Sequence, residues 1–187
     1  MIALRKIFFP ILIILFLLVL DGFLLNDLQL ENEKFPTFQT VDLAGNKFTE
    51  KIFADKITIL CIWTTSQENL EILSDLNDLQ KNLRADIQII CLVGDIRAGD
   101  EKISLAKNIS EKFAPNILQL TVNDDFYKIL SKIKTVPTTI FLDKNLNLVG
   151  QPAANINFIL RELDYILEKN SEKHVALQTI QEFIFFK

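Results

Sequence analysis

Apolar runs separated by amphipathic segments follow each other along most of the chain. Residues 57–62 and 87–93 are nearly uninterrupted apolar runs, typical of strands buried on both faces of a parallel sheet. Gly94-Asp95 ends the second run. Further strands are predicted over residues 38–43, 117–122, 138–142 and 148–150.

Helical patterns lie between these runs. The spacing of apolar residues predicts helices over residues 67–83, 101–113, 125–131 and 155–169. Helical crossovers favour parallel pairing of the first strands, whereas the last two strands form a hairpin across a turn at Asp143–Asn147. A second turn is predicted at Asp42–Lys47, where Gly45 supplies a positive φ. The predicted class is α/β, with a central mixed sheet flanked by helices.

The first 25 residues form a separate apolar block. Residues 7–20 are uninterrupted apolar, and the block reaches 19 residues if it is counted to Leu25. That length is close to the roughly 20 residues of a bilayer span, although the shorter count also fits a cleaved signal peptide. Because no small-residue cleavage pattern follows, we expect residues 7–25 to be a transmembrane anchor or uncleaved signal.

Charge fixes the expected orientation of this anchor. Arg5 and Lys6 precede it, whereas acidic residues follow it, so residues 1–6 are expected in the cytoplasm and the remainder outside. Residues 26–34 form a short polar linker. The whole chain has a net charge of −4, and the body after residue 20 has −6 because the two bases are removed. An acidic body without a basic cluster argues against binding to nucleic acid.

One polar segment lies between the first long strand and the first long helix. It reads Trp63-Thr64-Thr65-Ser66-Gln67, and Val136-Pro137 stands far downstream, directly before another strand. This arrangement resembles the membrane-anchored thioredoxin-like proteins of the TlpA and AhpC/TSA (redoxin) group, over residues 35–170. The resemblance implies a thioredoxin-like fold on the extracytoplasmic side of a bacterial cell membrane, anchored by a single span.

The resemblance also assigns roles to positions. In that group the segment reads Trp-Cys-x-x-Cys, so Thr64 and Gln67 occupy the two cysteine positions beside Trp63. The matching proline is cis there, and the residue before it pairs with an extended substrate. Pro137 is therefore expected to be cis, with Val136 as a peptide-docking position. The alternative is that Pro137 only shapes a turn and has no role in peptide docking.

Thr64 and Gln67 cannot perform the chemistry of two cysteines. Exchange requires a thiolate of lowered pKa and a second thiol that resolves the mixed disulfide. A hydroxyl is far too basic, and an amide resolves nothing. The spacings Thr64–Gln67 and Thr65–Glu68 instead suit capping boxes, so this segment is expected to cap a helix without reacting.

Two cysteines remain, Cys61 and Cys91, each inside an apolar run. Neither is at a predicted helix N-terminus, so we expect inert core thiols. A structural bridge is an alternative, because the two strands are neighbours in the predicted fold, but adjacent strands fit disulfide geometry poorly. Catalysis by this pair is the remaining alternative.

The predicted function is a protein-binding or scaffolding module whose partner is an extracytoplasmic protein or peptide. The alternative is a divergent thiol–disulfide oxidoreductase or peroxidase that uses Cys61 or Cys91. No metal site and no cofactor are expected, since His174 is the only histidine and no phosphate-binding loop is present. Residues 171–187 form a C-terminal amphipathic extension, expected to pack on the domain or else to contact a membrane or partner.

Overall fold

The computed structural model describes residues 33–66 and 70–169. The predicted cytoplasmic end, the anchor at 7–25, most of the linker, Gln67 and the extension at 171–187 lie outside the described residues. Among the helices formed by the described residues, none has both the length and the apolar character needed to cross a bilayer.

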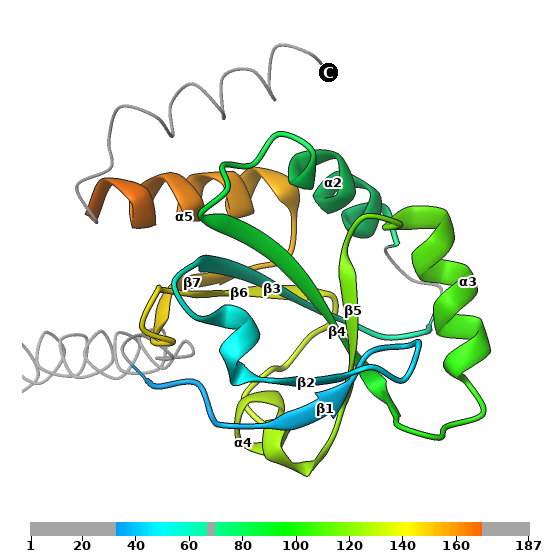
Figure 1. Cartoon of the computed structure of the whole chain (residues 1–187). Coiled ribbons are helices and arrows are strands. Elements are labelled where there is room, and N and C mark those ends of the chain that lie inside the picture. The colour runs from blue at the N-terminus through cyan, green and yellow to red at the C-terminus, as the bar shows by residue number, and fades with distance from the viewer. Residues whose placement is uncertain (1–32, 67–69, 170–187) are drawn as a thin grey trace, which may run out of the picture.

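A mixed five-stranded sheet forms the centre of the molecule (Figure 1). The strand order is β5-β4-β3-β6-β7. Strands β3, β4 and β5 run parallel, whereas β6 pairs antiparallel with β3 and β7 pairs antiparallel with β6. This pairing confirms the predicted parallel core with an antiparallel hairpin. The strands are β3 (Ile57–Trp63), β4 (Ile87–Arg97), β5 (Leu118–Val122), β6 (Thr138–Leu142) and β7 (Leu148–Ala153).

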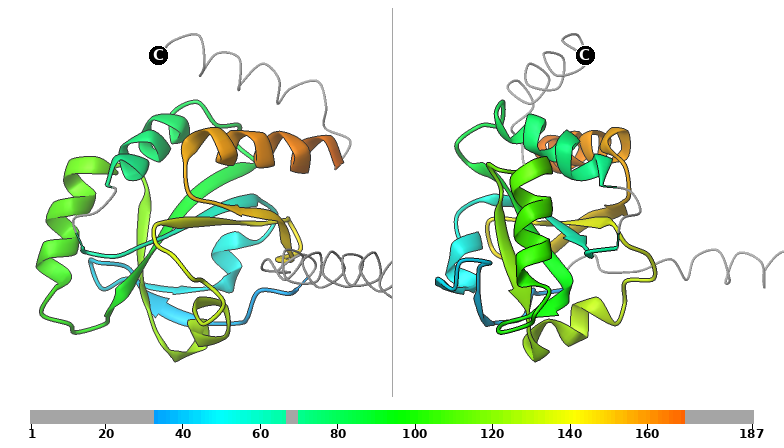
Figure 2. Two further views of the ribbon diagram at one scale, coloured as in Figure 1. Left: turned by 180° about the vertical axis from the view of Figure 1, so that it is seen from behind. Right: turned by 90° about the vertical axis from the view of Figure 1, so that its right-hand side faces the viewer.

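Helices cover one face of this sheet (Figure 2). Alternate residues of β3 point to opposite sides, as strand geometry requires. Cys61 and Trp63 belong to the core under the helices, whereas Leu60 and Ile62 belong to the core on the other side. Each face is therefore covered by its own apolar layer. The helices on this face are α2 (Glu71–Gln80), α3 (Ile103–Phe113) and α5 (Ile156–Lys169).

Short elements and aromatic rings cover the opposite face. Four buried phenylalanine rings pack there with neighbouring centroids 4.8–6.2 Å apart. The rings belong to Phe35, Phe38, Phe53 and Phe126. They hold the N-terminal hairpin and the segment after β5 against the sheet. The elements on this face are β1 (Gln39–Val41), β2 (Lys47–Thr49), η1 (Glu50–Phe53), η2 (Asp124–Phe126) and α4 (Tyr127–Leu130).

In the turn of each hairpin, an aspartate carboxylate accepts hydrogen bonds from the backbone. Asp42 Oδ1 accepts hydrogen bonds from the backbone N–H groups two and four residues later, each 2.8 Å long. Asp143 does the same in the β6–β7 turn. Such turns need positive φ at the fourth residue, and Gly45 adopts φ 92°, as predicted. The tight turns fix the register of the strands that they join.

The structure differs from the sequence predictions in three places. The first long helix begins at Glu71, four residues later than the predicted start. Strand β4 does not end at Gly94 but continues to Arg97, with an irregularity in its pairing with β5 after Val93. Strand β2 was not predicted, because three residues of which one is apolar give too short a pattern.

Candidate functional site

The candidate site lies where the end of β3 meets the start of β6. Ile62 of β3 is opposite Thr138 of β6 in an antiparallel ladder. Continuing that register by two residues places Thr64 opposite Val136. The Val136–Pro137 peptide bond is cis, as the resemblance implied. Val136 is 43% exposed and is therefore accessible to a ligand directly before β6.

Hydroxyl groups occupy the position at which the resemblance implied thiols. The Thr64 hydroxyl forms a 2.7 Å hydrogen bond with the Ser66 hydroxyl. Thr65 is buried and faces Asp95 of β4. Its N–H donates to Asp95 Oδ1 at 3.0 Å, and its hydroxyl donates to Oδ2 at 2.7 Å. The loop after β3 is thus held by a carboxylate and contains no sulfur among Thr64, Thr65 and Ser66.

The predicted capping boxes do not lie at the start of the described helix. Helix α2 begins at Glu71 with Leu70 at the N-cap, and no side chain makes a cap hydrogen bond there. The Thr65 hydroxyl is instead bound to Asp95. Glu68 and Gln67, the partners expected for Thr65 and Thr64, lie outside the described residues. Thr65 therefore anchors the loop to β4, and neither Thr64 nor Thr65 begins the described helix.

Asp95 is a site residue that sequence reasoning missed. The parallel register pairs Trp63 with Val93, so two residues further along Thr65 comes beside Asp95. Lys102 lies near the same carboxylate, with its Nζ 3.9 Å from Oδ2. The only signal in the sequence is an acid at the carboxyl end of a buried strand, which by itself indicates no more than the end of that strand.

Trp63 contributes to the core and not to a surface groove. Its side chain is 1% exposed, and its indole Nε1 donates a 3.0 Å hydrogen bond to Gln119 Oε1 of β5. Trp63 therefore offers no surface to a peptide bound beside Val136-Pro137. Gln119, 6% exposed, is a second residue that the sequence pattern missed.

Replacing Gln119 with leucine is expected to lower the free energy of unfolding by about 1–3 kcal/mol, since the buried indole N–H loses its acceptor. Chemical denaturation followed by tryptophan fluorescence measures this, because Trp63 is the only tryptophan. Gln151→Leu, at an exposed position of β7, is the matched control and is expected to change stability by less than about 0.5 kcal/mol. Equal effects of the two substitutions would contradict this role for Gln119.

The two cysteines face each other inside the sheet. Cys61 and Cys91 are paired in the β3–β4 register, both are free thiols, and both are 0% exposed. The pKa of the Cys91 thiol is raised well above its ordinary value, most by a hydrogen bond with Cys61 and next by burial. A raised pKa disfavours the thiolate, the reactive form of cysteine. Neither thiol reaches the loop at Thr64, which lies beyond the end of β3.

The site offers no obvious metal ligands. Within residues 33–66 and 70–169 no three His, Cys, Asp or Glu side chains gather as a metal site would require. His174 lies outside the described residues. What the described site provides is an exposed backbone segment at Val136, hydroxyl groups at Thr64 and Ser66, and the carboxylate of Asp95.

Comparison with solved structures identifies the fold. No protein-family model matches the chain, and no curated protein matches its sequence. A thiol:disulfide interchange protein from Bacteroides sp. aligns with a TM-score of 0.62 and 16% identity, covering 78% of this chain and 95% of that one. The thioredoxin domain of a thiol-disulfide oxidoreductase from Bacteroides vulgatus aligns with a TM-score of 0.58 and 18% identity, covering 74% and 96%.

A lipoprotein thioredoxin from Streptococcus pneumoniae is a third similar structure, with a TM-score of 0.52, 20% identity and coverage of 78% of this chain and 98% of that one. Each likeness spans nearly the whole of the compared domain. At such identities the likeness concerns the fold, and the chemistry has to be argued from the site.

Proposed function

We propose that this thioredoxin-like domain binds an extended polypeptide at the Val136–Pro137 loop without exchanging disulfides. One observation carries the proposal: a hydroxyl pair, Thr64 and Ser66, stands beside the cis-proline loop where exchange would need a thiolate. Peptide recognition by backbone hydrogen bonds needs only an accessible extended segment. Val136 lies in an exposed bend directly before β6, where a peptide could pair with the backbone without any sulfur.

The sequence supports a place for this binding outside the cytoplasm. Residues 7–25 would anchor the chain in the membrane, with Arg5 and Lys6 retained on the cytoplasmic side. The domain would then meet exported polypeptides, which are the proposed partners. The scaffolding role follows from this location, since a tethered binder keeps its partner at the membrane.

The rival function is thiol chemistry by Cys61 or Cys91. It requires a thiol that a substrate can reach and that ionises near neutrality. Both thiols are fully buried in the sheet, and the pKa of Cys91 is raised. These two properties favour the binding function over the rival.

Photocrosslinking tests the binding function directly. A benzophenone amino acid at Val136 of the full chain is expected to crosslink insulin B chain whose cysteines have been alkylated, a peptide unable to exchange disulfides. The same probe at Tyr127, 74% exposed on α4, is the matched control and is expected to give no adduct. Adducts of equal yield at both positions, or none at Val136, would overturn the proposal.

Native thiol labelling tests the rival function. Both cysteines are expected to resist a disulfide reagent in the folded full-length protein for hours at pH 7, and both are expected to react within minutes in guanidinium, because only unfolding exposes them. Release of the reagent's chromophore gives the count and the rate. Rapid labelling of one thiol in the native protein would favour the oxidoreductase.

A further inference from the structure

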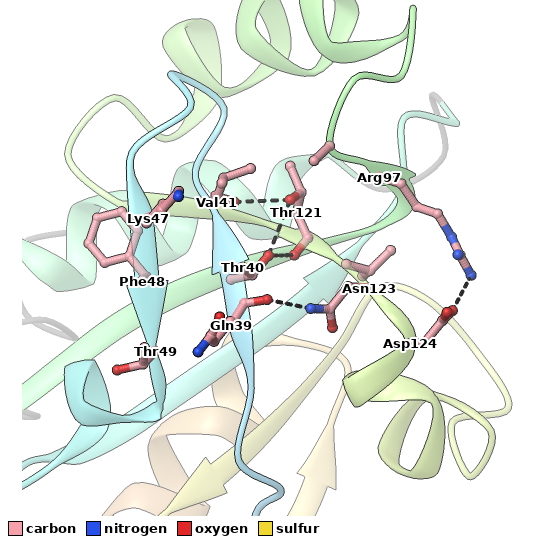
Figure 3. A pocket seen from close by; sticks show the side chains of 12 residues that line it. Gln39, Thr40, Val41, Lys47, Phe48, Thr49, Arg97, Thr121, Asn123 and Asp124 are labelled. Carbon is pink, nitrogen blue, oxygen red and sulfur yellow. Dashed lines mark hydrogen bonds and ion pairs between the residues drawn. The ribbon is translucent and has the colours of Figure 1, made fainter.

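A pocket of about 590 Å³ lies between the N-terminal hairpin and the ends of β4 and β5 (Figure 3). It is separate from the Val136–Pro137 loop, whose residues do not line it. Its volume falls in the range of small-molecule sites, roughly 300–1,000 Å³. The lining residues come from β1 and β2 on one side and from Arg97–Ala98 and residues 121–124 on the other.

The hairpin wall of the pocket is firmly held. The Thr40 hydroxyl donates to the Thr121 carbonyl at 2.6 Å, and the Thr121 hydroxyl donates to the Val41 carbonyl at 3.0 Å. The Asn123 amide donates to the Gln39 carbonyl. Figure 3 shows these bonds fastening β1 to the end of β5. The pocket is therefore preformed, which favours ligand binding because little ordering is needed.

Two cationic side chains and one carboxylate line this pocket. Among the described residues, neither the Lys47 ammonium nor the Gln39 side-chain amide has a hydrogen-bond or ion-pair partner. Arg97 pairs with Asp124 through one nitrogen at 2.9 Å, which leaves other N–H donors of its guanidinium for a ligand. The charged lining residues are Lys47, Arg97 and Asp124, so the pocket has one excess positive charge in a protein of net charge −4.

Apolar side chains complete the lining, namely Val41, Phe48, Ala98 and Val122. An apolar wall with few polar groups is the usual composition of a small-molecule site, and here the polar groups are mainly donors. Asp125, close by, is already an acceptor for the Gln39 N–H and the Asn123 amide. From this we infer that the pocket binds a small organic carboxylate, with its carboxylate near Lys47 and its apolar body against Val41, which pairs with Lys47 on the same face of the hairpin. The inference is independent of peptide docking at Val136.

Titration of the ¹⁵N-labelled full chain in detergent micelles with 4-phenylbutyrate tests this assignment. The acid is expected to shift the backbone amide signals of Val41 and Asn123, and to leave that of Leu163 in α5 unchanged, with saturation at about millimolar concentration. The neutral analogue 4-phenylbutan-1-ol is expected to bind about three- to fivefold more weakly, since it lacks the charge that Lys47 attracts.

Two variants separate charge from shape. Lys47→Gln is expected to weaken binding of the acid about three- to fivefold and to leave the affinity for the alcohol unchanged. Lys51 is an exposed lysine of η1 outside the pocket, and Lys51→Gln is expected to change neither affinity. Ala98→Trp, at an exposed position, fills the pocket and is expected to abolish both. Circular dichroism would confirm that this variant is folded. No shift at Val41 and Asn123, equal affinity for acid and alcohol, or an unchanged Lys47→Gln variant would overturn the assignment.

Discussion

The double variant Thr64→Cys, Gln67→Cys is expected to reduce insulin at least about tenfold faster than the wild-type full chain, with dithiothreitol as the electron source. The two substitutions restore a Cys-x-x-Cys sequence directly after β3. A thiolate at position 64 would lie opposite Val136 across the β3–β6 register, where a bound polypeptide would present its disulfide. Wild type is expected to stay at the rate of dithiothreitol alone, because its only thiols are buried.

Three further proteins make this result specific. Thr64→Ser, Gln67→Ser changes the same positions without adding sulfur and is expected to remain inactive. Thr64→Cys alone is expected to form mixed disulfides but to turn over slowly, since the resolving thiol is missing. Cys61→Ser, Cys91→Ser in the wild-type background is expected to change nothing. If wild type already matched the double-cysteine variant, the proposed loss of exchange would be wrong.

Asp95 adds a second expectation for the same variant. Its carboxylate accepts two hydrogen bonds from Thr65, next to the new thiol. A nearby negative charge disfavours a thiolate and so raises its pKa. The double-cysteine variant is therefore expected to gain activity as the pH rises above neutrality, and Asp95→Asn in that background is expected to shift the profile to lower pH. An unshifted profile would mean that Asp95 does not act on position 64.

The fold could be predicted from the sequence because apolar runs report burial strongly. Strands β3 and β4 are apolar throughout their central residues, so their place in a parallel core follows from composition alone. The period of two along β3 also accounts for the packing of Cys61 and Trp63 on one face, under the helices. Strand β2 gave no such signal, because only one of its three residues is apolar.

The site could be predicted only where one segment determines it. Thr64 follows its strand directly, and the cis bond at Pro137 was implied by resemblance; both are where they were expected. Asp95 and Gln119 could not be found in this way, since their partners lie 30 and 56 residues away. Those contacts depend on the register between strands, and the pattern within one strand does not reveal it. For the same reason the hydroxyl of Thr65 was assigned to a helix cap when its partner is a neighbouring strand.

Phe126→Ala is expected to lower the free energy of unfolding by about 3–5 kcal/mol, the largest effect that we expect from a single substitution. The Phe126 ring is 0% exposed and lies 4.8 Å from the Phe38 ring, centroid to centroid. Removing it leaves a cavity between the hairpin and the sheet, where the other buried rings cannot easily close the space. Urea denaturation of the full chain in micelles, followed by far-UV circular dichroism, measures the loss.

The adjacent residue provides the matched control. Tyr127 is 74% exposed, and Tyr127→Ala is expected to change stability by less than about 0.5 kcal/mol. The two substitutions remove rings of nearly equal size from consecutive positions, so only burial distinguishes them. Phe126 lies two residues after Asp124, which lines the pocket and pairs with Arg97. Because Phe126→Ala loosens this segment, the substitution is expected to weaken 4-phenylbutyrate binding as well. A small loss of stability for Phe126→Ala would mean that the aromatic cluster does not hold the hairpin, and the pocket would then not be preformed.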